Sequence, residues 1–478
     1  MEKNSIPTTE TIFELFKQLN KVPRPSWHEE RVADWLCAFA VNNGLECQRD
    51  EHNCIVMRKP ASAGHENAEP IVLHAHMDMV CVATPDKPFN PLTDPIEAYV
   101  EEGWMKAHGT SLGADNGMGL CMALAVMQHK ELTHGPLELF VTTNEEDGMT
   151  GAANVSPDFV RARKMIDLDS EDYDTITVGA AGAYLQTARL PFEAQEAPSL
   201  QYFKVSISGG LGGHSGVDIG KGRMSAVKQI CLLIDALRSA CKSLEVADIH
   251  AGEANASIAA NAVVTVGVNP SEIEILKQVA GSFNPRTPND AQVSVTSAET
   301  EKPATIIPAT TIGELTKCIA AIPFGVVKMS EHMPGTVETS NNIGVIRTEA
   351  DHLHISTHTR SFIDADMIAL GESIGKTFRS HGTTTQLIMS TPAWEENPHS
   401  DYMHLVEQTF EDVLGFTPRK VEMHFVMEMG YFVQKFPGIQ IIPIGPRIIE
   451  PHSTSERIEL STIEGIWKVL VELLCRLA

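Results

Sequence analysis

Short apolar runs alternate with segments of helical periodicity along the first quarter of the chain. Runs at 54–58, 71–80 and 137–143 are typical of buried strands, and residues 117–129 form an apolar helical segment before the last of them. Apolar runs separated by helices predict a mostly parallel sheet that is covered on both faces. Ligands of such sheets bind beyond the carboxyl ends of the strands, so polar residues that follow these runs are the first candidates for a site.

A predicted helix precedes the first of these strands. Apolar residues at helical spacing mark its buried face: Val32, Trp35, Leu36, Phe39 and Ala40. Ser26 and Glu29 have the spacing of a capping box, which predicts that the helix starts beside them.

The pattern changes near residue 190. Residues 203–216 (FKVSISGGLGGHSG) are typical of a strand that enters a glycine-rich turn, and a long helix follows from about 222 to 244. Further strand patterns continue to about residue 385, after which helix 402–415, strand 439–446 and a closing amphipathic helix return to the first pattern. We therefore expect an α/β domain with a mixed, mostly parallel sheet, built from residues 1–190 and 389–478, and an inserted α+β domain of residues 191–388.

Composition bears on the partners of the chain more than on its fold. Its 478 residues include 37 basic and 62 acidic side chains, a formal net charge of −25. Phosphates and anionic membrane surfaces repel such a protein, so we expect neither nucleic acid nor membrane as a partner. No apolar run approaches the roughly 18 residues that span a bilayer, and the N-terminal segment lacks the pattern of a secretory signal. The nine scattered cysteines form no CxxC pair, which favours a reducing cytoplasm.

Histidines and acidic residues gather after the predicted strands. They are His74, His76, Asp78, Asp115, Glu145, Glu146, Asp147, Asp167, Asp169, Glu171 and His452. Taken singly, each group also fits an ordinary role, such as a helix cap for Asp115 or a solvated loop for the acids at 145–147. Adjoining carboxylates repel one another, however, and no basic residue adjoins them. Together these side chains form an N/O ligand set suited to two zinc or similar ions.

The order of the motifs resembles the di-zinc peptidases of the aminoacylase and carnosinase type, and within that group the Xaa-His dipeptidases. The motifs are H-x-D at 76–78, G-A-D-N-G at 113–117, T-N-E-E at 143–146, L-D-S-E at 168–171, G-G-H-S-G at 212–216 and P-H-S at 451–453. The resemblance begins near PSWHEE at 25–30 and reaches the closing helix. It implies a zinc-peptidase catalytic domain with an inserted lid domain.

Five metal ligands follow from this resemblance. His76 and Asp169 would bind one zinc ion, Glu146 and His452 would bind the other, and Asp115 would bridge the two. Cobalt or manganese would be able to substitute for zinc.

The resemblance also implies roles for residues that bind no metal. Asp78 would orient His76, and Glu145 would be the general base. In the inserted domain, His214 would polarise the scissile carbonyl, and Arg360 would hold the terminal carboxylate of the substrate. Asn255 would line the same pocket, although the family's usual G-G-T-x-x-N-A-I places the asparagine one position away. MEMG at 427–430 differs from the usual L-E-C-G, so its glutamate receives no role.

The implied activity is metal-dependent hydrolysis of dipeptides, Xaa-His dipeptides among them. On the same scaffold, an acyl-amino-acid deacylase or a tripeptide aminopeptidase is the alternative, although deacylases usually carry a shorter lid. A metal-binding scaffold without activity would have no need of Glu145. The expected partner is a small peptide substrate. The resemblance leaves open whether the chain forms a homodimer and whether His214 serves its own active site or that of a partner subunit.

Overall fold

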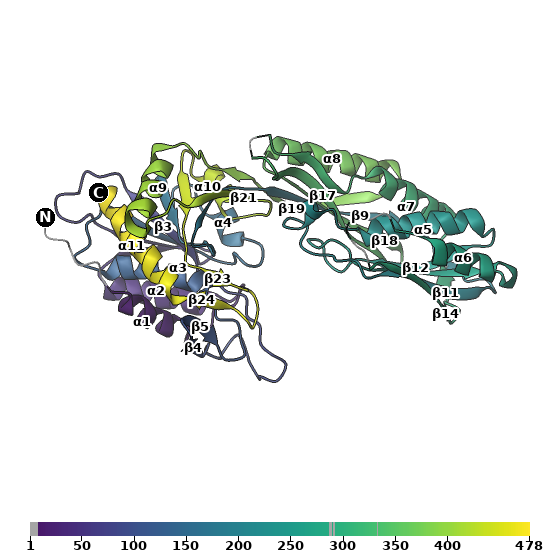
Figure 1. Cartoon of the computed structure of the whole chain (residues 1–478), viewed down its shortest axis with the longest axis horizontal. Coiled ribbons are helices and arrows are strands. Elements are labelled where there is room, and N and C mark those ends of the chain that lie inside the picture. Colours follow the sequence, from purple (N-terminus) through teal and green to yellow (C-terminus); the bar gives the residue numbers. More distant parts are fainter. Residues whose placement is uncertain (1–7, 286–288, 290–291, 332) are drawn as a thin grey trace. The chain divides into compact units, whose positions relative to one another are not determined.

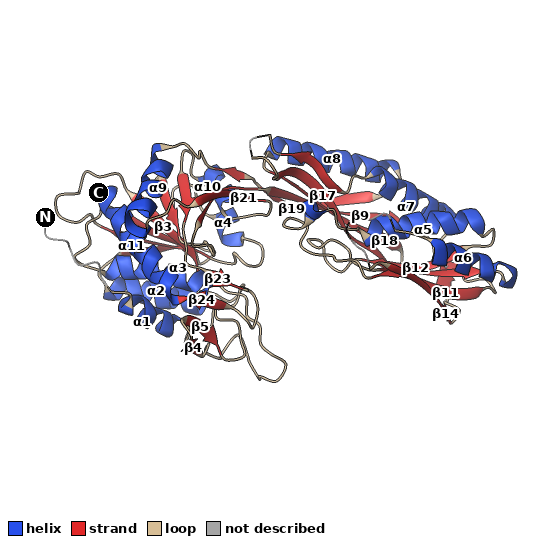
Figure 2. Ribbon diagram, viewed as in Figure 1, coloured by secondary structure: helices blue, strands red, loops and turns tan. Residues whose placement is uncertain are grey.

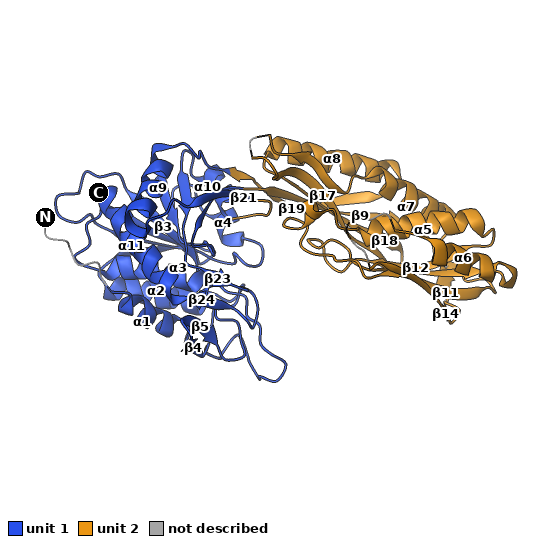
Figure 3. Cartoon of the chain, in the orientation of Figure 1, with its two compact units in different colours: residues 1–179, 395–422, 428–478 blue, residues 180–394, 423–427 orange. Residues whose placement is uncertain are grey.

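The computed structural model describes residues 8–285, 289, 292–331 and 333–478, and the course of the chain is shown in Figure 1. The chain divides into two compact units (Figure 3). Unit 1 comprises residues 1–179, 395–422 and 428–478, and unit 2 comprises residues 180–394 and 423–427. The domain boundaries that we predict after residues 190 and 388 fall inside two strands of unit 2, β9 (Gly182–Pro191) and β19 (Thr384–Thr391).

A six-stranded sheet forms the centre of unit 1, in the order β1-β2-β6-β3-β7-β22. Its strands are β1 (Glu46–Arg49), β2 (Ile55–Lys59), β3 (Ile71–His76), β6 (Leu137–Thr142), β7 (Lys164–Asp167) and β22 (Gln440–Pro443). The pairs β3–β6, β3–β7 and β7–β22 are parallel, whereas β1–β2 and β2–β6 are antiparallel. Every residue of β3 and β6 is buried, as expected for a sheet covered on both faces. The predicted mixed, mostly parallel sheet is confirmed.

Helices surround this sheet (Figure 2). They are α1 (Glu10–Leu19), α2 (Glu30–Asn42), α3 (Ala114–Gln128), α4 (Thr150–Asn154), α9 (Asp401–Leu414), α10 (Met429–Lys435) and α11 (Leu460–Arg476). Helix α3 packs against α1 and against strands β3 and β6, and all but one of its residues are buried. A helix that is apolar all round is expected at such an interior position. It begins at the carboxyl ends of the strands, where it brings Asp115 to the sheet edge.

The capping box predicted at the start of α2 is wrong in its hydrogen bonds, although the helix itself is present. Val32, Leu36, Phe39 and Ala40 are buried as expected, but Glu29 makes no side-chain cap. Its carboxylate and the hydroxyl of Ser26 instead bind residues of the candidate site, described below.

Smaller sheets complete unit 1. A four-stranded sheet has the order β23-β24-β5-β4, and a three-stranded sheet has the order β20-β8-β21. These strands are β4 (Ala98–Glu101), β5 (Trp104–Ala107), β8 (Thr175–Ala180), β20 (Trp394–Glu395), β21 (Arg419–Met423), β23 (Ile448–Ile449) and β24 (Arg457–Glu459).

Unit 2 consists of a nine-stranded sheet with helices on one face (Figure 2). Along β14-β11-β13-β12-β17-β18-β9-β19, with β16 beside β17, the strand pairs are antiparallel. Besides β9 and β19, the strands are β11 (Gln201–Ser208), β12 (Glu245–Ala251), β13 (Ala262–Val268), β14 (Ser294–Thr300), β16 (Gly325–Met329), β17 (Val337–Thr348) and β18 (His352–Ser361). Strands β10 (Gln195–Glu196) and β15 (Thr305–Ile306) form a separate pair.

The helices of unit 2 cover the apolar face of its sheet. They are α5 (Ala226–Ala240), α6 (Ile273–Ser282), α7 (Ala309–Ala321) and α8 (Asp364–Ser380), with 3₁₀ turns at Ile219–Lys221 and Pro270–Glu272. One continuous core joins their inner faces to β11, β12, β13, β17 and β18. The predicted α+β character of the inserted segment is confirmed. Within the described residues, no helix is long and apolar enough to cross a membrane.

Candidate metal centre

The candidate site of unit 1 lies where four strands of its central sheet end. Strand β3 ends at His76, β6 at Thr142, β7 at Asp167 and β22 at Pro443. The loops that follow β3, β6 and β7 carry the acidic clusters noted in the sequence. Parallel pairing of β3 with β6 and β7 therefore brings residues far apart in the chain to one edge.

Three of the predicted ligands already form a compact group. His76, Asp115 and Glu146 each offer one ligand atom, and these atoms lie within 4.8 Å of one another. Nε2 of His76 lies 3.2 Å from Oδ1 of Asp115 and 3.6 Å from Oδ1 of Asp169. On the other side, Nε2 of His452 lies 3.0 Å from Oδ2 of Asp115 and 2.8 Å from Oε2 of Glu146. The structure thus brings all five predicted ligands together, with Asp115 in the middle.

The two histidines and Asp115 influence one another's protonation. Burial alone would raise the pKa of Asp115, but hydrogen bonds with His452 and His76 lower it below its usual range. Hydrogen bonds with Asp115 and Glu146 raise the pKa of His452 to about 11. Asp169 also accepts a hydrogen bond from the side-chain amide of Asn116, the residue that directly follows Asp115 in α3.

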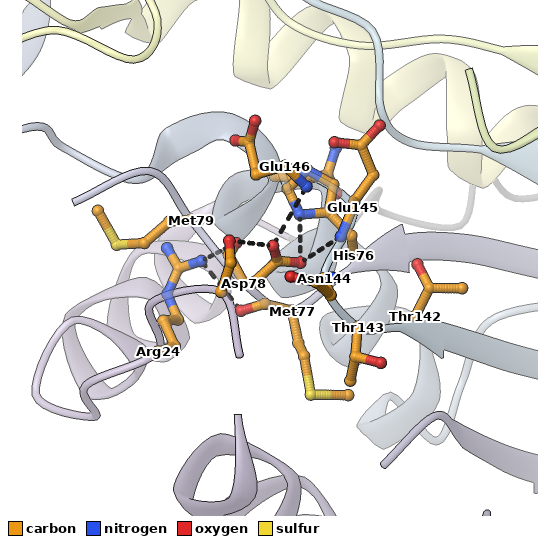
Figure 4. Close-up of polar contacts among 12 residues, drawn as sticks. Arg24, His76, Met77, Asp78, Met79, Thr142, Thr143, Asn144, Glu145 and Glu146 are labelled. Carbon is orange, nitrogen blue, oxygen red and sulfur yellow. Dashed lines mark hydrogen bonds and ion pairs between the residues drawn. The ribbon is translucent and has the colours of Figure 1, made fainter. Parts of the chain in front are cut away.

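Asp78 is the fully buried anchor of this centre (Figure 4). Its Oδ1 lies 3.4 Å from Nδ1 of His76 and accepts a hydrogen bond from the Glu145 backbone N–H at 3.1 Å. Its Oδ2 accepts hydrogen bonds from the Glu146 backbone N–H at 3.3 Å and from the Ser26 hydroxyl at 2.7 Å. One carboxylate therefore faces the ring of a predicted ligand and holds the backbone of the two glutamates.

Glu29 supports the same loop from another direction. Its Oε1 accepts a hydrogen bond from the Asn144 backbone N–H at 2.9 Å, and burial followed by the charge of Asp78 raises its pKa to about 7. The loop also contains Asn144 and Met149 at positive φ, 54° and 53°. Such backbone angles persist where the surroundings hold them.

Glu145 is half-buried, and its carboxylate makes no hydrogen bond to the described residues. Burial raises its pKa well above the usual value, and the charges of Asp169, Glu428 and Glu146 add to this effect, against that of His76. A carboxyl group of raised pKa is suited to accept and release a proton near neutral pH.

Sequence reasoning missed two residues that shape the Asp115 loop, Arg24 and Glu456. The Arg24 guanidinium is buried and donates to the backbone carbonyls of Met77, Asp78 and Gly113 at 3.2, 2.9 and 2.6 Å. Gly113 has a φ of +68°, and a Cβ there would lie 2.5 Å from Nη2 of Arg24. The position therefore requires glycine. No local pattern around Arg24 signals these bonds, because its partners are distant backbone groups.

Glu456 holds the other side of the loop. Its carboxylate accepts hydrogen bonds from the backbone N–H groups of Leu112, Gly113 and Ala114 at 2.7, 2.9 and 2.8 Å. The Asp115 N–H donates to the same carboxylate at 3.4 Å. Successive N–H groups pointing at one carboxylate form an anion-binding loop, here filled by the protein itself. Glu456 lies four residues after His452, but no local pattern signals its bonds to a loop more than 340 positions away.

His74 lies behind the site and contacts no predicted ligand. Its Nδ1 lies 2.6 Å from Oδ1 of Asp167, its Nε2 lies 3.3 Å from Oε2 of Glu428, and its ring packs edge-on against Phe432. The hydroxyl of Thr142 donates to the same glutamate oxygen at 2.8 Å. Glu428, which received no role from the sequence, thus belongs to a buried hydrogen-bonded network beneath the metal centre.

The predicted substrate residues lie in unit 2. Arg360 is buried on β18, and neither its Nε nor its Nη1 has a hydrogen-bond partner among the described residues. Burial lowers its pKa to about 10. His214 follows the glycine-rich turn, and its Nδ1 accepts hydrogen bonds from the backbone N–H groups of Gly216 and Val217 at 3.3 and 3.2 Å. Asn255 is half-buried, and its backbone carbonyl accepts a bond from the Asn342 amide.

The chemistry of the unit 1 centre fits divalent metal ions. Within the described part of the chain, its carboxylates crowd together without a lysine or arginine partner, and the nearby Arg24 donates to backbone carbonyls. Oε1 of Glu146 is buried and finds no hydrogen-bond partner among the same residues. Imidazole nitrogens and carboxylate oxygens at the ends of separate strands are the ligand types that zinc and similar ions accept.

Comparisons with known proteins point in the same direction. Residues 72–476 match the peptidase family M20/M25/M40. The chain is 32% identical over 487 residues to the cytosol non-specific dipeptidase of Escherichia coli (strain K12), with 99% of each chain covered. It is similar to the solved structure of aminoacylhistidine dipeptidase from Vibrio alginolyticus, with a TM-score of 0.84, 28% identity, and 99% and 98% of the two chains covered. The aminopeptidase PepT structure from Bacillus cereus shares the fold, with a TM-score of 0.63, 17% identity, and 99% and 100% covered.

Proposed function

The chain belongs to the peptidase family M20/M25/M40, and from that premise we propose that it is a metal-dependent dipeptidase. The resemblance carried by the sequence motifs is confirmed. The observation that carries the proposal is the group of imidazoles and carboxylates in unit 1, in which Asp115 faces His76 with one oxygen and His452 with the other. The E. coli and Vibrio relatives, both named as dipeptidases and both matched over their full length, support the substrate size.

We assign two divalent ions to this centre, with zinc as the native metal. His76 and Asp169 would hold one ion, Glu146 and His452 the other, and Asp115 both. The distances support this division, because His76 lies near Asp169 and His452 lies near Glu146, on opposite oxygens of Asp115. Two such ions would lower the pKa of the attacking water toward about 7 and would polarise the carbonyl of the substrate.

The side chains of the protein then move the proton. Glu145 takes it from the attacking water and delivers it to the nitrogen of the leaving amine. Its raised pKa suits both steps, since the carboxyl group must accept the proton and then give it up. Asp78 keeps the His76 ring in orientation and holds the backbone of Glu145 through an N–H hydrogen bond.

Substrate length is set by recognition of a free carboxylate in this proposal. The Arg360 guanidinium is 2% exposed and has no acidic partner among the described residues. A buried unpaired charge is costly, so an anion is expected beside it. We assign to it the terminal carboxylate of the dipeptide, and to His214 the scissile carbonyl oxygen. Asn255 would line the pocket through its side chain.

A panel of substrates tests the proposal. The metal-loaded protein should hydrolyse dipeptides, including Xaa-His dipeptides, faster than acyl amino acids or tripeptides of matched side chains. Preference for acyl amino acids would identify a deacylase, and preference for tripeptides a tripeptide aminopeptidase. Activity that survives removal of the metal by a chelator would contradict the metal dependence.

We also propose a cytoplasmic location, which the name of the E. coli relative and the free cysteines support. The sequence leaves open whether the chain forms a homodimer, and light scattering in solution would determine its molar mass.

A further inference from the structure

One face of the unit 2 sheet is polar and yet buried where β17 and β18 pair. Ile355 of β18 belongs to the apolar core, so His358 and Arg360, three and five residues further along the strand, lie on the opposite face. The antiparallel register sets Ser340 of β17 opposite Arg360 and Asn342 opposite His358. Polar residues therefore occupy neighbouring positions on both strands of this face.

Several polar atoms here are buried and have no hydrogen-bond partner within the described part of the chain. They include both ring nitrogens of His358, Nε and Nη1 of Arg360, and Oδ1 of Asn342. His358 is only 4% exposed. Buried polar groups in folded proteins are nearly always paired, and an unpaired one costs free energy. A concentration of such atoms on one sheet face indicates a surface that receives a polar ligand.

Two further histidines share the surroundings of the arginine. Nε2 of His424 lies 2.8 Å from the hydroxyl oxygen of Ser340, and its Nδ1 is buried without a partner. Burial lowers the pKa of His358, His424 and His214, and the charge of Arg360 lowers each further. The three rings are therefore neutral near pH 7. Neutral His358 offers one N–H donor and one acceptor nitrogen.

The charge on this face identifies the class of ligand. Glu338 is the acid at the alternate position before Ser340 on β17, and its carboxylate lies 2.6 Å from Nζ of Lys328. Arg360 thus supplies one positive charge without an acidic partner among the described residues, while the neighbouring imidazoles add none. A single positive charge beside neutral donors matches a monoanionic carboxylate better than a dianionic phosphate.

We propose that His358 is a second substrate-binding residue, whose ring N–H donates a hydrogen bond to the terminal carboxylate that Arg360 attracts. The inference rests on the proposed function, in which the arginine holds that carboxylate. A carboxylate has about four acceptor sites, so a bidentate guanidinium leaves room for another donor. A neutral imidazole supplies this donor without a second positive charge.

The test compares free-acid and C-terminally amidated forms of one dipeptide. In His358→Phe, an aromatic ring is kept and the N–H is lost, so kcat/KM for the free acid should fall about 10- to 100-fold, the range for a hydrogen bond to a charged group. For the amidated dipeptide, kcat/KM should fall about twofold or less. His358→Gln, which retains an N–H donor, should recover most of the free-acid activity. His354 is a half-buried histidine on the same face of β18, and His354→Phe is therefore the matched control. It should leave kcat/KM unchanged for both substrates.

Different outcomes separate this inference from the proposed function. Equal loss on acid and amide in His358→Phe, or no loss on either, would overturn the role of His358. An equal loss of free-acid kcat/KM in His358→Gln and His358→Phe would also overturn it, because the N–H donor would then be irrelevant. Arg360→Ala tests the proposed function itself: if that variant still prefers the free acid by the wild-type factor, the carboxylate is held elsewhere. Thermal unfolding of each metal-loaded variant verifies that the chain is folded, and His358→Leu replaces the Phe variant if the larger ring prevents folding.

Discussion

Nε2 of His452 lies 3.0 Å from Oδ2 of Asp115, although 337 positions separate the two residues in the chain. The other oxygen of the same carboxylate lies 3.2 Å from His76. Asp115 can therefore serve two ligand groups at once, one formed by the start of the chain and one that includes its last histidine. This relationship supports the proposed two-ion centre over a single-ion centre with spare acids.

The neighbouring residues Glu145 and Glu146 should differ in role. Glu145→Gln should keep near-normal metal content and lower kcat about 10²- to 10⁴-fold, the usual contribution of a general base. Glu146→Gln should instead weaken the binding of one ion, because its Oε2 lies 2.8 Å from His452. Metal analysis and kcat of both variants check the prediction, with exposed Asp147→Asn as the control. Equal metal loss in the two glutamate variants would show that the roles are assigned wrongly.

Glu456 should stabilise the loop that presents Asp115. Glu456→Gln removes the charge from a carboxylate that accepts three short backbone hydrogen bonds, so it should lower the free energy of unfolding by about 1–3 kcal/mol. It should also weaken metal binding, since the loop positions the bridging ligand. Denaturant unfolding and metal affinity measure the two effects. Glu450→Gln, a surface carboxylate paired with Arg457, is the control and should have little effect on either.

The His74 network should make stability depend on alkaline pH. Burial alone would lower the pKa of His74, but hydrogen bonds with Asp167 and Glu428 outweigh it and raise the pKa to about 9. A raised folded-state pKa contributes stability that is complete below the unfolded value of about 6.5 and is lost as the pH rises through about 9. The contribution is roughly 3 kcal/mol. Unfolding free energies of wild type and His74→Gln should therefore converge between about pH 6.5 and 9. A constant difference across that range would contradict the charged state of His74.

Arg360 should contribute to catalysis through the substrate carboxylate. Arg360→Ala should lose about 2–5 kcal/mol of transition-state binding, the range for truncating one partner of a buried charge pair. In kcat/KM this is roughly 30- to 5,000-fold. The kcat/KM of Arg360→Lys should lie between those of wild type and Arg360→Ala, because lysine keeps the charge and loses the planar fork. Arg189→Ala, a 58% exposed arginine on strand β9, is the control. An Ala variant with unchanged kcat/KM on dipeptides would contradict the assignment.

The sequence predicts the parts of this site that repeat a local pattern. His76 and the acids at 145–146 and 167–169 directly follow apolar runs, and parallel pairing places the ends of such runs together. Arg24 and Glu456 escape this reasoning because they bind backbone groups that are distant in the chain, which no side-chain spacing predicts. Ser26 and Glu29 show the opposite error: their spacing fits a helix cap, but hydrogen bonds to Asp78 and Asn144 prevail.

The central claim is a dipeptidase that needs two metal ions per chain. Metal-free protein should be titrated with zinc while the hydrolysis of a dipeptide is followed, and Asp115→Ala should be titrated beside it. We expect activity to appear with added zinc and to reach its plateau near two equivalents per chain, and we expect the Ala variant to bind zinc weakly and remain inactive. Full activity without metal, or a plateau at one equivalent that Asp115→Ala leaves unchanged, would contradict the account.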